Sequence, residues 1–489
     1  MKFPEFIRLN DLDNVIVLPF GGSSGEGNGV FMLNGDIPPG HKAASRDIAE
    51  GEHVIKHGHP IGAATRDIAR GDWVHRHNLA ARTGTGASAP RLPKWEGAKS
   101  SMPGLMGGSF MGYRRMAERP GVRNDLWVIP TSGAVNGELR SILGNYGKPY
   151  WISSVKLLEH PLGGSDPRED TGTVAAILAG LAENPNAAGV LLVGLGCENI
   201  SLSEIHSRVI GKDLNVMKLT LQDAPDCAGS VCRMLDELAA AAPRVREKFP
   251  VSQLCVGVKC GGGVGYAWLT ANPLIGRFSD YLVEHGGAVV TTDASEMGRA
   301  LDAVLPRMAN KRAYDDFEVL YRWFHDRSAA RDRPEGKISP QPDGTPGITT
   351  PEEKSLGALE KIGGKSLVTN VLRYGEGAYP AHGAQIAFAP GDDAISCTSM
   401  AGSGCQIILF ATGGGTPFGS VVPTVKISAV TELKERHPGW IDFDAGVLLR
   451  GESLDEAAER LREHILSVAC GERTAHEKKG FGEISIFRG

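Results

Sequence analysis

The chain has 489 residues, 41% of them hydrophobic and 22% charged, and its formal net charge at pH 7 is −5. A chain of this length is too long for one hydrophobic core, so we expect two or three domains. The near balance of charges gives no bias toward nucleic acid or an anionic membrane and is typical of a globular enzyme. Glycine is abundant: 64 residues gather in short loops, a pattern that suits backbone approaching a ligand.

No targeting or membrane signal is visible in the sequence. The first residues lack a basic segment followed by an apolar one, and the longest apolar run, near AAGVLLVGLG, is far shorter than the roughly 20 residues of a membrane helix. We therefore expect a cytoplasmic protein with neither a membrane nor a nucleic acid as partner. Eight cysteines in a chain of this length do not resemble a disulfide framework, and we expect most of them to be small buried side chains.

The N-terminal part of the chain contains an internal repeat. Residues 44–57 (ASRDIAEGEHVIKH) and 64–77 (ATRDIARGDWVHRH) share eight identities in fourteen positions. Two copies are too few for a solenoid. They predict two matched hairpin-like units, each with a turn that leads into a short strand, in a small, mostly β domain over residues 1–82. Residues 83–108, rich in Gly, Ser, Pro and Ala, are predicted to be a linker.

Two histidines, His75 and His77, stand at the end of the second repeat. In a strand they would share a face with Trp73, because side chains alternate with period two. His77 aligns with His57 of the first repeat, so the architecture of the repeat can explain it, whereas His75 aligns with Ile55. We therefore place His75 slightly ahead of His77 as an acid–base residue.

From about residue 110, short apolar runs alternate with helix-length segments. DLWVIP, AGVLLVGLG, QLCVGVK and GGAVVTTD each precede such a segment, and GAQIAFA and CQIILFAT continue the pattern. The alternation predicts an α/β region of parallel, Rossmann-like sheets. We place one α/β lobe, the catalytic one, at residues 109–330 and a second at 351–489. The Pro- and Gly-rich connection at 331–350 is either a boundary between lobes or an active-site loop.

Polar residues follow these predicted strands. In open α/β sheets ligands bind outside the carboxyl ends of the strands, so the residues after each strand form a candidate site. They are Thr131-Ser132-Gly133, Gly196-Cys197-Glu198-Asn199, Lys259-Cys260-Gly261-Gly262-Gly263, Thr292-Asp293 with Glu296, Gly391-Asp392-Asp393, and Gly413-Gly414-Gly415-Thr416. These glycines, carboxylates, lysine and thiols suit a small polar anion bound with a metal.

Several of these residues also have a structural interpretation. Cys197 and Glu198 are either metal ligands or a buried thiol beside a helix-capping acid. Lys259 is either a base, an anchor for a carboxylate, or half of a structural ion pair. His160 precedes a Gly-rich turn, where a surface histidine is the ordinary alternative to a catalytic one. Arg123, directly before a strand, could clamp a carboxylate or occupy an exposed turn.

Many of these segments together resemble the altronate/galactarate dehydratase family of sugar-acid dehydratases, over essentially the whole chain. Residues 37–79, which contain the repeat, are similar to the family's small N-terminal SAF-type domain, a β-clip-like fold. The other segments that carry the resemblance are GYRRMAERPGVRNDLWVIPTSGAVN, HPLGGSD, GLGCEN, VKCGGG, TANPLIGRFSDYLVEHGGAVV, EEKSLGALEKIGG, APGDDAISCTSMAGSGCQIILFATGGGTPFGSVVPTVKIS and WIDFDAG. So many ordered motifs are far more specific than any one of them.

The resemblance implies a hydro-lyase that removes water from a sugar acid and gives a 2-keto-3-deoxy acid by metal-assisted β-elimination. The C2 proton beside a carboxylate is only weakly acidic, so a cation or hydrogen-bond donors must stabilise the enediolate. We expect a divalent metal as cofactor, Fe2+ in the first place, with Mn2+ or Zn2+ as alternatives, and a homo-oligomer, a dimer, as the assembly.

The available residues fall into three groups under this interpretation. The acid–base candidates are His75, His77, His160 and Lys259, and we expect His75→Ala to abolish turnover while the fold survives. The metal candidates are Cys197, Glu198 and Cys260. We expect the substrate to be bound by Arg123, Asn124, Asn136, Asp392 and Thr416.

The chain departs from the family's usual motifs at the ends of several strands. The family commonly has cysteine where this chain has Gly164 and Ala358, and Ser-Asp where it has Gly263 and Val264. If the four family cysteines act together, this chain binds its metal differently or not at all. Two alternatives stay open: a related lyase or hydrolase that acts on another small hydroxy acid, for example one with a sulfonate leaving group, and a non-catalytic sugar-acid-binding protein.

Overall fold

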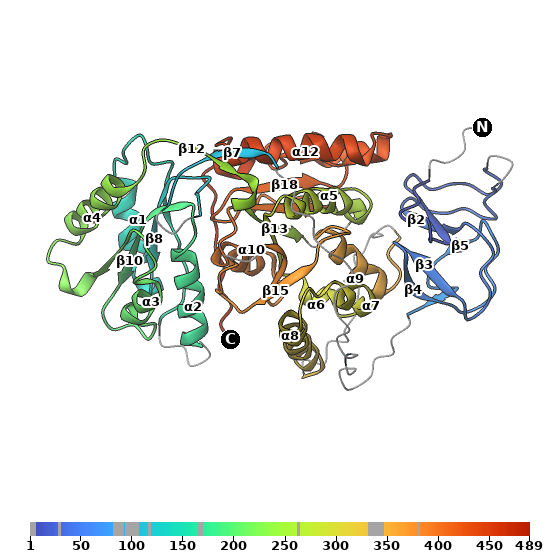
Figure 1. Ribbon diagram of the computed structural model, residues 1–489, viewed down its shortest axis with the longest axis horizontal. Coiled ribbons are helices and arrows are strands. Elements are labelled where there is room, and N and C mark those ends of the chain that lie inside the picture. The colour runs from blue at the N-terminus through green and yellow to red at the C-terminus, as the bar shows by residue number, and fades with distance from the viewer. Residues whose placement is uncertain are drawn as a thin grey trace.

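The structure is a computed structural model that describes residues 6–27, 31–81, 92, 107–115, 119–164, 170–261, 265–330, 347–378 and 382–489. Three domains lie in a row, with the N-terminal domain at one end, the second domain at the other and the C-terminal domain between them (Figure 1). No helix in the described ranges is both long and apolar enough to cross a membrane. The predicted linker at 83–108 lies outside these ranges except for Leu92, Gly107 and Gly108.

The N-terminal domain consists of two small antiparallel sheets. One contains β1 (Val15–Leu18), β2 (His41–Ala44) and β5 (Trp73–Val74), in the order β1-β2-β5. The other contains β3 (His53–Lys56), β4 (His59–Ala64) and β6 (Leu79–Ala80), in the order β3-β4-β6. The predicted mostly β domain is confirmed.

The two repeats of this domain are related by a local two-fold pseudo-symmetry. Ile48 and Ile68, which are equivalent in the repeats, donate and accept reciprocal backbone hydrogen bonds of 2.9 Å. Two further bonds are also symmetry equivalents, because the amide of Gly51 donates to Ala64 and that of Gly71 donates to Ala44, each at 2.9 Å. The predicted pair of matched units is confirmed.

The second domain is a parallel four-stranded sheet with the strand order β11-β10-β8-β9. Its strands are β8 (Asp125–Pro130), β9 (Val155–Leu157), β10 (Ala187–Gly194) and β11 (Val216–Thr220), and its helices are α1 (Asn136–Gly144), α2 (Thr171–Ala182), α3 (Leu202–Val209) and α4 (Cys227–Ala241). An antiparallel pair, β7 (Ser109–Gly112) with β12 (Glu247–Pro250), connects this domain to the next.

The C-terminal domain contains a parallel seven-stranded sheet in the order β15-β16-β14-β13-β17-β18-β19. The strands are β13 (Cys255–Cys260), β14 (Ala288–Thr291), β15 (Val368–Leu372), β16 (Gly383–Ala387), β17 (Ile407–Thr412), β18 (Thr424–Ser428) and β19 (Phe443–Asp444). The helices are α5 (Ala271–Glu284), α6 (Ala294–Met297), α7 (Leu301–Val304), α8 (Lys311–Ala330), α9 (Pro351–Glu360), α10 (Asp393–Gly402), α11 (Thr431–Arg436), α12 (Leu454–Ala469) and α13 (Ala475–Lys478). The predicted parallel α/β region is confirmed.

The predicted lobe boundary at residues 331–350 is wrong. Strands β13 and β14, which precede it in the chain, pair in one sheet with β16 and β17, which follow it. The two parallel sheets separate instead between β11 and β13, around residue 250. Residues 331–346 lie outside the described ranges, and residues 347–350 lead into helix α9.

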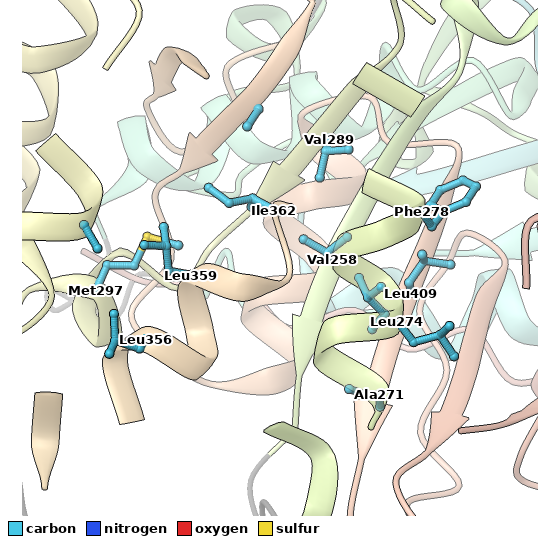
Figure 2. Close-up of a cluster of buried hydrophobic side chains, with 14 of the residues drawn as sticks. Val258, Ala271, Leu274, Phe278, Val289, Met297, Leu356, Leu359, Ile362 and Leu409 are labelled. Atoms are coloured by element: carbon cyan, nitrogen blue, oxygen red, sulfur yellow. The ribbon is translucent and has the colours of Figure 1, made fainter. Parts of the chain in front are cut away.

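Apolar side chains from the helices bury the faces of the large sheet. Val258 and Leu409 from the sheet pack with Leu274 and Phe278 of α5, and Leu359 of α9 belongs to the same cluster (Figure 2). All five side chains are buried. They belong to the close-packed interior between the helices and the sheet. Helix α9 is thus anchored to the core by one of its faces.

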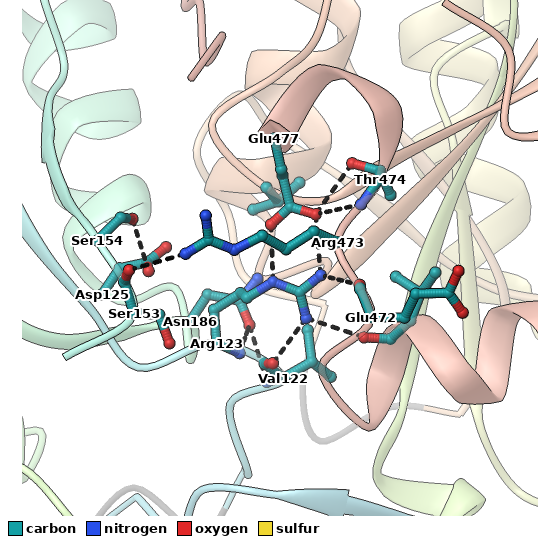
Figure 3. Close-up of polar contacts among 12 residues, drawn as sticks. Val122, Arg123, Asp125, Ser153, Ser154, Asn186, Glu472, Arg473, Thr474 and Glu477 are labelled. Atoms are coloured by element: carbon teal, nitrogen blue, oxygen red, sulfur yellow. Dashed lines mark hydrogen bonds and ion pairs between the residues drawn. The ribbon is translucent and has the colours of Figure 1, made fainter. Parts of the chain in front are cut away.

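A buried arginine joins the second domain to the C-terminal domain (Figure 3). The guanidinium of Arg123 donates two hydrogen bonds to the carboxylate of Glu477, at 2.7 and 2.9 Å. It donates three more to the carbonyl oxygens of Val122, Val468 and Glu472. All five N–H donors of the guanidinium are therefore occupied. Because none remains for a ligand, the prediction that Arg123 binds a substrate is wrong.

Removing this arginine tests its structural role. We expect Arg123→Met to lower the free energy of unfolding by about 3–5 kcal/mol, because the carboxylate of Glu477 would stay buried without a cation. Arg114→Met, which breaks an exposed ion pair with Glu247, is the control and should hardly change stability. Urea unfolding followed by circular dichroism measures both variants. Equal midpoints for Arg123→Met and wild type would contradict this role.

Candidate active site

A small cavity lies at the carboxyl ends of β13 and β16, close to the point where the order of the large sheet reverses between β13 and β17. Open α/β sheets bind ligands at such a point. The cavity has a volume of about 110 Å³, and the residues that line it are Lys259, Cys260, Gly261, Trp268, Asn272, Glu296, Ile348, Lys354, Gly357, Ala358, Lys361, Gly391 and Asp393. Three of the six predicted strand-end groups, those after β13, β14 and β16, thus line one cavity.

A buried carboxylate between two lysines lies at the bottom of this cavity. The ammonium of Lys259 lies 2.9 Å from one carboxylate oxygen of Asp293, and that of Lys361 lies 2.8 Å from the other. Burial by itself raises the pKa of Asp293, but the two ammonium groups outweigh it and lower that pKa to about 2. Burial likewise opposes the charge of Lys259, yet the carboxylates of Asp293, Glu296 and Asp393 raise its pKa above the usual value. All three groups are charged at neutral pH, so Lys259 cannot accept a proton there.

Lys361 differs from Lys259 in its hydrogen bonds. Its ammonium is fully buried, and the carboxylate of Asp293, at 2.8 Å, is its only polar partner among the described residues, so most of its three N–H donors stay unused. A buried ammonium with unused N–H donors beside a cavity can bind an anion.

Two more carboxylates line the cavity and are partly open to solvent. Asp393 has a side chain that is 40% exposed and lies 3.7 Å from the ammonium of Lys259. Glu296 lies 3.7 Å from Lys354. The thiol of Cys260, also at the cavity, has a raised pKa because burial disfavours the thiolate. Asp393 and Glu296 are therefore the cavity groups best placed to exchange protons.

The other predicted strand-end residues gather at a different edge, the carboxyl end of the four-stranded sheet. Glu198 accepts hydrogen bonds of 2.6 Å from the hydroxyl of Thr131 and the amide of Gly196. His160 is buried, with Nε2 lying 2.7 Å from the carbonyl oxygen of Pro130 and Nδ1 accepting from the amide of Leu162. Both ring nitrogens are thus engaged by backbone.

Asn136 and Cys197 belong to the same edge. The amide of Asn136 donates to the carbonyl oxygen of His160 at 3.0 Å, and the exposed thiol of Cys197 accepts from Gln222 at 3.8 Å. The predicted metal candidates are therefore divided, because Cys197 and Glu198 follow β10 whereas Cys260 ends β13. In the parts of the chain that the structure describes, no three His, Cys, Asp or Glu side chains could hold a metal ion together. These residues do not fit a divalent metal bound by three protein side chains.

The remaining predicted substrate-binding residues have local structural partners. Asn124 precedes β8, at its amino end, and donates to the carbonyl oxygens of Trp151 and Pro243. Asp392 caps α10 by accepting from the amide of Ile395 at 3.0 Å, and the hydroxyl of Thr416 accepts from the amide of Phe418. None of the three lines the cavity described above.

His75 and His77 lie in the N-terminal domain, where the chain turns after β5. Their rings lie 5.1 and 5.3 Å from the ring of Trp73, and the indole N–H of Trp73 donates to Nδ1 of His41 at 3.2 Å. His41 and the next residue, Lys42, leave β2 on opposite faces. Lys42 faces the C-terminal domain, so His75, which lies beside His41 and does not line the cavity, is on the other side of this sheet. Its acid–base role stays a prediction.

Lys354 and Lys361 were missed by the sequence analysis. They are seven residues apart in EEKSLGALEKIGG, which is two turns of a helix, and Gly357 and Ala358 lie between them on the same face. This helical spacing can be recognised in the sequence. The partner of Lys361, Asp293, could not be identified without the fold. Ala358 lines the same cavity as Cys260.

Comparisons with known proteins match the three domains separately. Residues 4–82 match the altronate/galactarate dehydratase SAF domain, 112–243 the second domain of D-galactarate dehydratase/altronate hydrolase, and 251–489 the C-terminal domain of D-galactarate/altronate dehydratase. The chain is 38% identical to the altronate dehydratase of Bacillus subtilis and 34% identical to that of Escherichia coli, covering 99% of each pair. It is 30% identical to the β subunit of (2R)-sulfolactate sulfo-lyase from Chromohalobacter salexigens, over 78% of this chain and 98% of that one.

The raised pKa of Cys260 can be tested directly. We expect alkylation of Cys260 by iodoacetamide to accelerate with pH beyond pH 9, because the thiolate is the nucleophile and burial raises the pKa of this thiol. Mass spectrometry of the peptide that contains Cys260, sampled over time between pH 7 and 10, measures the rate. A rate that levels off below pH 9 would contradict the environment described for this cavity.

Proposed function

The chain belongs to the D-galactarate/altronate dehydratase family, and from that premise we propose that it is a hydro-lyase that removes water from a sugar acid and yields a 2-keto-3-deoxy acid. The observation that carries this proposal is the buried ammonium of Lys361, which lines the cavity and whose only polar partner among the described residues is the carboxylate of Asp293. A substrate carboxylate is the anion that this group would bind. The names of the two altronate dehydratases support an aldonate as substrate.

The reaction is a β-elimination followed by tautomerisation. A base removes the C2 proton, the electrons of that C–H bond form the C2=C3 double bond, and the hydroxyl of C3 leaves with a proton as water. The enol then takes up a proton at C3 and becomes the 2-keto acid. Negative charge builds up on the substrate carboxylate as the C2 proton leaves, so fixed cations beside it lower the barrier.

The cavity supplies groups for each of these steps. Lys361 and Lys259 hold positive charge beside the developing enediolate, and Asp293 fixes both ammonium groups in place. Asp393 is the base in this proposal because it is partly open to solvent and its carboxylate is stabilised by Lys259 at 3.7 Å. Glu296, which lies 3.7 Å from Lys354, is the acid in this proposal: it binds a proton from solvent and then delivers it to the leaving hydroxyl. The divalent metal stays a prediction, and no step above depends on it.

The sulfo-lyase relative favours a second candidate function. The same enediolate would form if the group lost from C3 were sulfite rather than hydroxide, since only the leaving group differs. The similarity over 78% of this chain supports including a sulfonated hydroxy acid among the substrates to be tested.

A substrate panel tests the proposal. The purified protein is incubated with aldonates, aldarates and sulfolactate, with and without Fe2+, Mn2+ or Zn2+, and 2-keto products are detected as semicarbazones. We expect a 2-keto-3-deoxy acid from at least one sugar acid. No product from any sugar acid under any metal condition would overturn the dehydratase proposal, and sulfite release from sulfolactate alone would favour the second candidate.

Two adjacent aspartates then provide a matched pair of variants on the best substrate. Asp393→Asn should lower kcat by roughly 10²- to 10⁴-fold, as expected when a general base is lost. Asp392→Asn should keep kcat within about twofold of wild type, since asparagine caps a helix as well as aspartate does. Equal losses in both variants would contradict the assignment of Asp393 as the base and would restore Asp392 as a substrate ligand.

A further inference from the structure

Helix α9 presents two polar faces to two different parts of the protein. Lys354, Gly357, Ala358 and Lys361 repeat at helical spacing and line the cavity. Glu353 and Glu360 are each one position earlier, so they form an adjacent face seven residues apart. This second face meets the N-terminal domain, because Glu353 pairs with Lys42 and Lys56. The helix therefore connects that domain to the cavity.

Lys56, the last residue of β3, makes the closest of these contacts. Its ammonium is 1% exposed and lies 2.5 Å from the carboxylate of Glu353. The same ammonium lies 3.0 Å from the ring centroid of Trp268, which lines the cavity. The next residue, His57, lies 3.5 Å from Glu360 at the other end of α9. The end of β3 thus contacts both carboxylates on this second face of α9, Glu353 through Lys56 and Glu360 through His57.

Trp268 lies between Lys56 and the cavity side of α9. A side chain at position 357 would meet the Cβ of Trp268 at 3.5 Å, which is ordinary contact distance, so the Trp268 side chain lies beside helix α9. A desolvated ammonium over an indole face is strongly attracted to it. Any displacement of Lys56 would therefore shift two walls of the cavity, the indole ring of Trp268 and helix α9.

We propose that Lys56 is a positioning residue for the elimination: the N-terminal domain, through this lysine, fixes Trp268 and helix α9 and so holds Lys354 and Lys361 in their places at the cavity. Lys56 does not touch the substrate and acts only through these two elements. The inference rests on the proposed function for its chemical meaning, but its geometric content concerns the cavity itself. It also gives the small N-terminal domain a role without placing a catalytic group there.

Lys42 is the matched comparison. It is also buried and also pairs with Glu353, at 2.9 Å, but its other contacts are with the carbonyl oxygen of Gly347 and the hydroxyl of Thr349. None of these partners is an aromatic ring. If docking of the N-terminal domain were all that mattered, replacing either lysine would have the same effect on the cavity.

The thiol of Cys260 reports on the cavity without requiring turnover. In the full-length protein, Lys56→Met should increase the rate of Cys260 alkylation by iodoacetamide about tenfold, because a strong cation–π contact and an ion pair are lost together. Lys42→Met should change it by less than about threefold, since the indole contact stays in place and Glu353 keeps Lys56 as its buried cation. The exposed thiol of Cys197 is the internal reference and should react at the same rate throughout.

Trp268 is then used to test the route of the effect. In a Trp268→Leu background, Lys56→Met should add little to the alkylation rate, because the two residues act through one contact. On the best sugar acid, Lys56→Met should lower kcat more than it raises KM, and Lys56→Arg should restore part of the loss. If Lys56→Met fails to fold, Trp268→Phe, which keeps an aromatic face, should retain slow alkylation, whereas Trp268→Leu should not.

The outcomes separate this inference from the proposed function. An unchanged Cys260 rate in Lys56→Met, equal increases in Lys56→Met and Lys42→Met, or additive effects with Trp268→Leu would each overturn the positioning role. A wild-type protein that turns over no sugar acid would overturn the proposed function, while the alkylation rates would still test the contact between Lys56, Trp268 and α9.

Discussion

The carboxylate of Asp293, held between the ammonium groups of Lys259 and Lys361, is the interaction on which the cavity depends. Three charges buried this deeply are tolerable only because each has an opposite charge within 3 Å. The cluster joins the end of β13, the turn after β14 and the end of α9, which are far apart in the sequence. Their ends are thereby brought together, and positive charge stays at the base of the cavity at neutral pH.

A second cluster of the same kind lies on the other side of α9. There the carboxylate of Glu353 is held between Lys42 and Lys56, again with all three side chains buried. The two clusters differ in charge, because burial lowers the pKa of Lys56 to about 7, whereas the pKa values of Lys259 and Lys361 are raised by Asp293. Helix α9 is held between them, with its apolar face packed into the core by Leu356 and Leu359 (Figure 2). Its position is therefore over-determined, as a wall of an active site should be.

Much of the fold could be predicted from the sequence because the signals are local. The apolar runs that became β8, β10, β13, β16 and β17 were recognisable, and the repeat correctly indicated a pseudo-symmetric β domain. The lobe boundary was not predictable, because β13 and β17 pair across some 150 residues and no local pattern reports such pairing.

The candidate site was only partly predictable for the same reason. The rule that ligands bind at strand carboxyl ends correctly brought Lys259, Cys260, Glu296 and Asp393 to one cavity. Arg123 was misassigned because it precedes a strand and so lies at the opposite, amino end, where it serves as an interdomain ion pair (Figure 3). Lys361 was missed because its meaning depends on Asp293, a partner supplied only by the tertiary fold.

The proposed function places the sugar acid at the cavity at the end of β13 and not at the edge of the four-stranded sheet. Protection of cysteines from alkylation measures this directly, because each place has its own thiol, Cys260 or Cys197. With saturating altronate, alkylation of Cys260 should slow severalfold while that of Cys197 stays unchanged. Protection of Cys197 with no change at Cys260 would contradict the account and would place the binding site at the end of β10.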